Sequence, residues 1–172
     1  MQRLAENVWR RDPAIAQETV GDLAWMTRQH AGHEDEWRRE VWLDGGVVAW
    51  SWIKPPARLF WEVDPRRTEL LDDVFAWFEE EAAGRPLEVA VRAGNSAAIR
   101  ALERRGFVHD PEAPWIRHNA RDLEHLAEPA APPGYRVATM AEVPDVAARV
   151  AVHRNAFHPS RVTEESYRRV MA

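Results

Sequence analysis

The stretch VWLDGGVVAWSW at residues 41–52 contributes most to the fold prediction. Apolar residues alternate with others on both sides of Gly45 and Gly46. Two glycines between such runs predict a β-hairpin, because the tight turn needs positive φ angles that glycine adopts freely. Two prolines at positions 55–56 end the second strand, and alternation resumes over 59–63. The sequence therefore predicts three consecutive strands.

The next segment predicts a long amphipathic helix over residues 68–83. Thr68 is its expected N-cap, Gly84 can end it, and Pro86 cannot continue it. Its apolar stripe follows the helical period and consists of Leu70, Leu71, Val74, Phe75 and Phe78. We expect this helix to pack on the sheet, followed by a strand over 87–91.

Two helices are expected before the hairpin, over residues 2–11 and 22–30, the second capped by Asp22. On the other side, the proline-rich stretch EPAAPPG at 128–134 predicts a stiff linker. Alternation over 135–140 predicts one more strand. A helix with Pro144 in its first turn and a short helix capped by Thr163 are expected to follow.

Composition excludes several classes of function. The net charge of −5 argues against a nucleic-acid partner, which needs a basic surface. The sequence has no run of about 18 apolar residues, so no membrane span is predicted. The chain has no cysteine, and no signal-peptide pattern opens it, so we expect a cytoplasmic protein. His30 and His33 precede three acidic residues, but a solvated loop is the preferred interpretation, and no metal site is expected.

The stretch NSAAIRALERRGF at 95–107 predicts a helix that Asn95 or Ser96 caps and Gly106 ends, with Phe107 opening a strand. Asn95, Ala98, Gly106 and Phe107 match the spacing of a motif of the GNAT superfamily, the acetyl-CoA-dependent N-acyltransferases. With the element order over 41–108, the chain resembles that superfamily. The resemblance implies an α/β (α+β) fold in three layers, with a mixed, mostly antiparallel sheet flanked by helices.

Two departures from the family pattern bear on activity. GNAT enzymes hold the coenzyme pyrophosphate on a glycine-containing loop before the long helix, whereas DPRRTELL at 64–71 has no glycine. By resemblance, the residues left for acetyl-CoA are Arg66, Arg67, Thr68 and Asn95. Leu102 stands where many of these enzymes keep a tyrosine general acid, and leucine cannot protonate a thiolate. No catalytic residue is assigned.

The segment after the linker resembles the first strand and helix of a second acetyltransferase domain. We therefore expect a degenerate GNAT-like domain at 1–127, the linker at 128–134, and the opening of a truncated second domain at 135–172, as in tandem-GNAT proteins. His153 and His158 fall in the loop that borders the acceptor site in the superfamily, where they could act as bases.

Two functional hypotheses follow. In the first, the complete protein transfers an acetyl group from acetyl-CoA to an amine, while this chain alone is weakly active or inactive. In the second, the chain is a non-catalytic structural or dimerisation module. Residues 135–140 are expected to pair with the sheet edge near 38–43, within one chain or exchanged in a homodimer. The alternative is that the tail packs its helices on the domain and leaves that edge bare.

Overall fold

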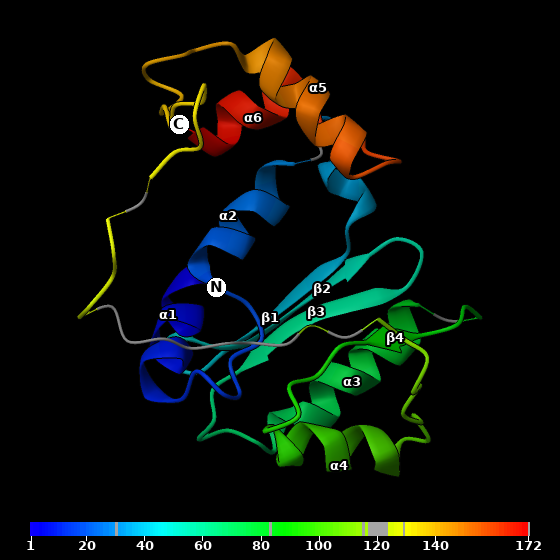
Figure 1. Ribbon diagram of the computed structural model, residues 1–172. Coiled ribbons are helices and arrows are strands. Elements are labelled where there is room, and N and C mark those ends of the chain that lie inside the picture. The colour runs from blue at the N-terminus through cyan, green and yellow to red at the C-terminus, as the bar shows by residue number, and fades with distance from the viewer. Residues whose placement is uncertain (30, 83, 115, 117–123, 129, 172) are drawn as a thin grey trace.

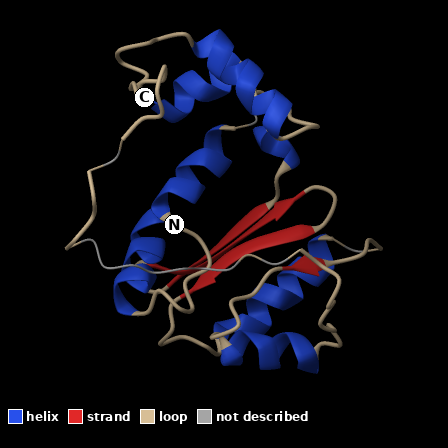
Figure 2. Ribbon diagram, in the orientation of Figure 1, coloured by secondary structure: helices blue, strands red, loops and turns tan. Residues whose placement is uncertain are grey.

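A four-stranded mixed sheet forms the centre of the fold (Figures 1 and 2). The computed structural model describes residues 1–29, 31–82, 84–114, 116, 124–128 and 130–171; His30 and Ala83, which the predicted helices include, lie outside these ranges. The strands are β1 (Arg39–Leu43), β2 (Val47–Lys54), β3 (Arg58–Val63) and β4 (Glu88–Val89). The first three pair antiparallel, and β4 pairs in parallel with β3. The predicted hairpin is confirmed, and Gly45 has the positive φ of +62° that its turn requires.

Helices cover both faces of this sheet, which confirms the three-layer α+β architecture (Figure 1). One face packs against α1 (Gln2–Arg11) and α2 (Val20–Arg28), and the other against α3 (Leu70–Glu81) and α4 (Ser96–Arg104). Alternate residues of β2 serve the two cores: Trp50 and Trp52 face α1 and α2, whereas Ala49 and Ile53 face α3. Phe75 on α3 is fully buried, and a side chain of that kind contributes about 1.5–3 kcal/mol.

Helix starts differ from the prediction at two places. Helix α2 begins two residues earlier than expected, because Thr19 is the N-cap and Asp22 completes a capping box with it. Helix α3 begins at Leu70, and Thr68 lies in the preceding turn rather than at the cap. The α4 prediction is confirmed, and Asn95 is its cap: the Asn95 Oδ1 accepts a hydrogen bond from the Ala98 N–H at 3.1 Å.

The C-terminal segment packs on α2. It contains α5 (Val146–Ala156) and α6 (Glu164–Met171). Asp145 caps α5, so Pro144 precedes the helix instead of lying in its first turn as predicted. Val150, Val162 and Tyr167 form a small core with Trp25 of α2 at its edge. Two ion pairs, Arg161–Glu36 and Arg169–Glu34, join the segment to the 3₁₀ turn Glu34–Glu36. This is the alternative in which the tail packs its helices on the domain.

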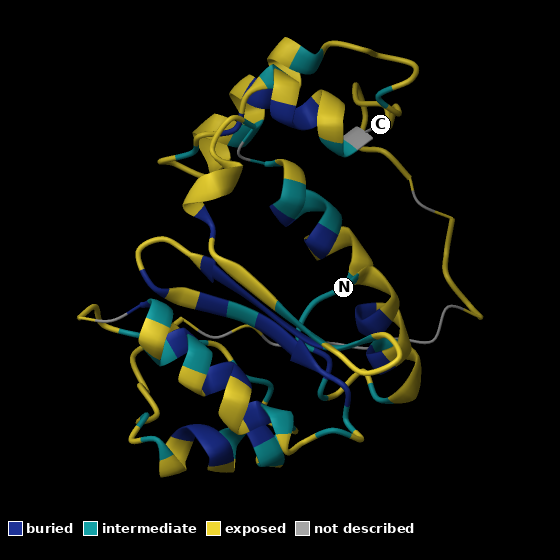
Figure 3. Ribbon diagram, turned by 180° about the vertical axis from the view of Figure 1, so that it is seen from behind, coloured by how far each residue is buried: buried dark blue, intermediate teal, exposed yellow. Residues whose placement is uncertain are grey.

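Three predicted strands are wrong or shorter than expected. Residues 135–140 are not a strand: Tyr135 and Val137 are 78% and 88% exposed and pair with no strand among the described residues. Alternation alone does not make a strand, because without a paired neighbour the backbone groups of a strand are satisfied only by water. Residues 107–108 are irregular, and the strand expected over 87–91 is reduced to β4. The chain from 130 to 145 is exposed almost throughout (Figure 3).

Candidate functional site

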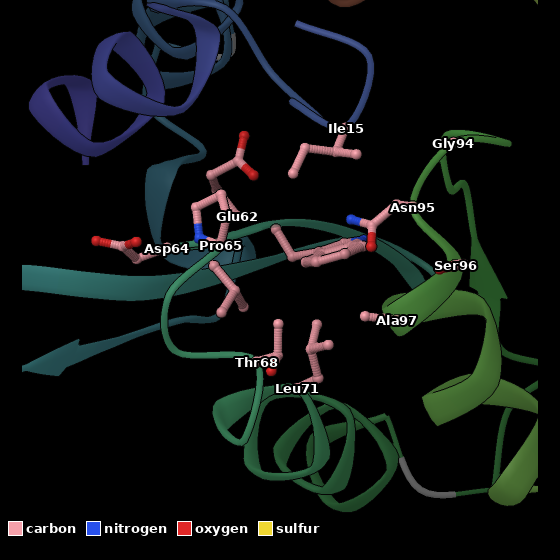
Figure 4. Close-up of a pocket in the computed structure, with 12 residues that line it drawn as sticks. Ile15, Glu62, Asp64, Pro65, Thr68, Leu71, Gly94, Asn95, Ser96 and Ala97 are labelled. Atoms are coloured by element: carbon pink, nitrogen blue, oxygen red, sulfur yellow. The ribbon is translucent and has the colours of Figure 1, made fainter. Parts of the chain in front are cut away.

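A pocket of about 190 Å³ lies where β3 ends (Figure 4). Its walls come from the last residues of β3, the turn into α3, the start of α4 and Ile15 of the α1–α2 connection. Figure 4 shows Thr68 and Leu71 on one side of this space and Asn95 and Ala97 on another. The pocket therefore lies at the N-terminal ends of two helices, α3 and α4.

Local sequence explains how the chain forms these walls. Asp64 directly follows β3 and organises the turn by accepting a hydrogen bond from the backbone N–H of Arg66 at 3.0 Å. Pro65 follows it, and the turn leads directly into α3. On the opposite wall, Gly94 approaches the Ala14 backbone so closely that a Cβ there would meet the Ala14 carbonyl oxygen at 3.3 Å. These contacts bring the α1–α2 connection against the α4 cap.

The four residues proposed for the coenzyme divide into two pairs. Thr68 and Asn95 line the pocket, and the Asn95 oxygen is already used in capping α4. Arg66 and Arg67 do not line it. Both guanidinium groups bond to carboxylates instead, Arg66 to Asp64 at 2.6 Å and Arg67 to Asp44 at 2.5 Å and to Glu69.

The same arginine contacts shift pKa values. The Asp64 carboxylate raises the pKa of Arg66, and Arg66 in turn holds the pKa of Asp64 below its usual value. The hydrogen bond to Arg67 likewise lowers the pKa of Glu69. Charges that are paired in this way give little net attraction to a phosphate. The turn over 64–71 is therefore nearly neutral to acidic.

Glu62 is the unexpected residue of this pocket. It is 1% exposed, and its Oε2 accepts a hydrogen bond from the backbone N–H of Gln17 at 2.9 Å. Burial, together with the nearby charge of Glu18, raises the pKa of Glu62 to about 8 despite the hydrogen bonds it accepts. Burial and the charge of Asp22 also raise the pKa of Glu18, to about 7. The sequence gives one signal that was missed, a single glutamate inside the apolar run LFWEV at 59–63.

Chemically, this pocket combines a carboxyl group, that of Glu62, which is mostly protonated at neutral pH, with apolar and hydroxyl side chains, the Asn95 amide and the Asp64 carboxylate. Such a carboxyl can donate or accept one proton. No side chain lining the pocket is a lysine or arginine, so an anionic ligand would find no cation there. Leu102 is buried.

A second titratable group lies between α5 and α6. Tyr167 Oη and His153 Nδ1 are 2.9 Å apart, and the Trp25 ring lies 5.2 Å from the imidazole. Burial and the cation of Arg149 lower the pKa of His153. The other histidine proposed as a base, His158, is exposed. His153 thus belongs to the packing of the tail, away from the walls of the pocket at the end of β3.

Comparisons with protein-family models, curated proteins and solved structures found no match for this chain. Within the described residues, no helix is both long and apolar enough to cross a membrane. The same part of the chain contains no cluster of three or more His, Asp or Glu side chains that could hold a metal ion. Fold and site together define an α+β protein with a small, acidic pocket between two helix N-termini.

Proposed function

We propose that this chain is a degenerate copy of a GNAT-type acetyl-CoA-dependent N-acyltransferase. In the complete protein, acetyl transfer from acetyl-CoA to an amine takes place elsewhere, and this copy supports the fold. The observation that carries the proposal is the turn at 64–71, which has the position of a coenzyme loop without its chemistry. It contains no glycine, and both of its arginines are paired with carboxylates.

Electrostatics supports the same conclusion. A helix N-terminus attracts anions through its dipole and its free N–H groups. Here Glu69, Asp72 and Asp73 occupy the start of α3, and Asp64 lies in the turn before it. Arg66 and Arg67 pair with Asp64 and Glu69, so carboxylates still outnumber these two cations at this helix end and oppose the binding of a pyrophosphate.

Calorimetric titration of the full chain with acetyl-CoA tests this proposal. We expect no saturable heat, which corresponds to a dissociation constant weaker than about 1 mM. Arg66→Gln and Asn95→Ala serve as location controls. A low-micromolar dissociation constant that either variant weakens would overturn the proposal, because the turn would then bind the coenzyme after all.

A second candidate function, dimerisation by strand exchange, is favoured by a specific observation. The outer edge of β1 bonds to no other strand of the described chain, and residues 135–140 of the same chain, exposed except for Met140, belong to no strand. We propose that this segment of one copy pairs with the β1 edge of another. Sedimentation velocity should then show a dimer that Val137→Pro dissociates, since proline cannot donate a ladder hydrogen bond. A wild-type monomer at high micromolar concentration would exclude the exchange.

A further inference from the structure

The α1–α2 connection, residues 12–19, forms one wall of the pocket at the end of β3. It has no regular secondary structure, and it contributes Ile15 to the pocket lining (Figure 4). The connection buries little apolar surface: Ala16 is fully buried but small, and Ile15 is only half-buried. The helices on either side bury larger side chains, among them Val8 and Leu23. The connection can therefore detach while the helices stay packed, because local opening favours segments with few buried apolar contacts.

Hydrogen bonds hold the α1–α2 connection in place. The Gln17 N–H donates to Glu62 Oε2 at 2.9 Å, and the Arg92 Nε–H donates to the Ala16 carbonyl at 2.8 Å. The guanidinium and the backbone groups keep the same charge over the whole range in which a protein is studied. The Glu62 carboxyl does not, so this attachment of the connection depends on pH.

Two carboxyl groups lie close enough to interact at this attachment. Glu62 of β3 is 1% exposed, and Glu18, in the connection itself, is half-buried. Burial raises the pKa of Glu62, and the charge of Glu18 raises it further. Backbone hydrogen bonds from the connection favour the charged form of Glu62, but burial outweighs them, and the pKa is about 8. Glu62 is therefore mostly neutral at pH 7.

The groups that face Glu18 come from four other parts of the fold. Burial raises the pKa of Glu18 most, and Asp22 of α2 raises it further. Arg92, which follows β4, and Arg58 of β3 oppose both effects, and the resulting pKa is about 7. From α1, the Trp9 Nε1–H donates to the Glu18 carbonyl at 3.2 Å, a contact without charge. Near pH 7 the Glu18 carboxyl is therefore about half ionised.

We propose that the α1–α2 connection is a pH-sensitive lid on the pocket, closed while Glu62 and Glu18 are protonated and released when both are ionised. Two carboxylates repel each other, and a buried carboxylate lacks the hydration that it would have in water. Release of the connection relieves both penalties, because it separates the two groups and lets water reach Glu62. The Gln17 hydrogen bond is then lost, and the pocket opens on the side that Ile15 covers.

The direction of the pH effect follows from these groups. In the released state both carboxyls are in water and have their ordinary pKa of 4.5. Their contribution to the closed state is therefore complete below about pH 4.5, and it is lost as pH rises through about 7 for Glu18 and about 8 for Glu62. The equilibrium constant for opening should rise at least about tenfold between pH 5 and pH 8, because each unit of pKa difference corresponds to a factor of ten.

Thiol labelling measures this opening, because the chain has no cysteine of its own. Ile15→Cys places a single thiol in the pocket wall, and Ser51→Cys places one in β2 at a fully buried position. Each labelling rate is divided by the rate of the same variant unfolded in urea at the same pH, which removes the titration of the thiol. The normalised rate of Ile15→Cys should rise at least about tenfold from pH 5 to pH 8. At pH 8 it should also be at least about tenfold above that of Ser51→Cys, which reacts only on global unfolding.

Charge variants identify the groups responsible. In the Ile15→Cys protein, Glu62→Gln and Glu18→Gln should each reduce the rise with pH, and the two together should abolish it. Glutamine keeps the size and the hydrogen-bonding capacity of each side chain and removes only the ionisation. Glu103→Gln, an exposed change on α4, is the matched control and should leave the rise unchanged.

Hydrogen–deuterium exchange tests the same lid without an added thiol. In the wild-type protein, the protection of residues 12–19, corrected for the intrinsic exchange rate at each pH, should fall between pH 5 and pH 8, whereas that of β2 falls less. The proposal is wrong if neither measurement shows a rise in opening with pH. It is also wrong if Ser51→Cys labels as fast as Ile15→Cys, or if the double glutamine variant keeps the full pH dependence.

Discussion

Glu62 is a carboxyl group that is buried where its charged form is disfavoured. A carboxylate is among the side chains least often buried, because leaving water penalises its charge. Glu62 is nevertheless held in the sheet opposite Trp50, and it accepts the Gln17 N–H. Its pKa of about 8 means that it is mostly neutral at pH 7. The fold tolerates this side chain by protonating it.

Stability should therefore fall as pH rises. The folded-state pKa of Glu62, about 8, lies above its unfolded value of 4.5, so the group's contribution is complete below about pH 4.5 and is lost as pH rises through 8. Glu62→Gln keeps an acceptor for the Gln17 N–H and removes the charge. At pH 9 it should raise the free energy of unfolding by a few kcal/mol, since each pKa unit is worth about 1.4 kcal/mol. At pH 5 it should change little.

Urea unfolding at pH 5, 7 and 9 measures this effect. Part of the pH dependence should remain in Glu62→Gln, because the pKa of Glu18 is also raised, to about 7. Glu103→Gln, an exposed change on α4, is the matched control and should leave the pH profile as it is. A profile identical in wild type and Glu62→Gln would contradict the buried, protonated state.

At the scale of elements, side-chain caps and sheet edges decide where each element starts and stops. Asn95 caps α4, and the Thr19–Asp22 box caps α2. Helix α3 has no side-chain cap, and it starts directly after the turn that Asp64 organises. The caps at Asn95 and Thr163 were predictable, because a cap needs only one polar side chain at a helix start. The start of α3 was not, because a hydrogen-bonded turn from Asp64 precedes it and Thr68 makes no cap.

Asn95→Ala should destabilise the protein by about 1 kcal/mol, through loss of the hydrogen bond to the Ala98 N–H. Ser96→Ala, one residue further on, should cost much less, because Ser96 is the first helical residue and makes no capping bond within the described chain. Equilibrium urea unfolding of both variants measures the difference. Equal losses would mean that Ser96 shares the cap.

At the scale of the whole molecule, the hydrophobic pattern predicted the three antiparallel strands and the helix that packs on them. The three-layer arrangement was implied by the resemblance to the GNAT superfamily, and the site where the tail docks was not predicted. The alternation of apolar residues correctly predicted β1 to β3, because each of these strands has a paired neighbour. The same alternation at 135–140 predicted a strand that does not form, because this segment has no paired neighbour. The packing of α6 on α2 depends on Trp25 and Tyr167, which lie far apart in the chain. The candidate pocket was not predictable for the same reason, since its walls come from separate elements.

Removing Tyr167 should loosen this docking and leave the sheet intact. Tyr167→Ala deletes the largest buried side chain of the tail core and its contact with His153. Hydrogen–deuterium exchange should become faster across α5 and α6, whereas β2 and β3 keep their protection. Arg168→Ala, which removes only an exposed pair with Glu164, is the control and should leave exchange unchanged. Faster exchange throughout the sheet would show that tail and sheet unfold together.

The exposed chain between 130 and 145 also makes the molecule divisible. Trypsin cleaves after arginine, and Arg136 lies in this exposed stretch without secondary structure. A single cut there should leave two fragments that stay associated, because Tyr167 contacts Trp25, and Arg161 and Arg169 pair with Glu36 and Glu34. The nicked species should elute as one particle, and Tyr167→Ala should promote its separation, because the apolar core around Tyr167 and Trp25 holds the two parts together. The covalent connection would then be a tether, and the two parts could be produced separately and recombined.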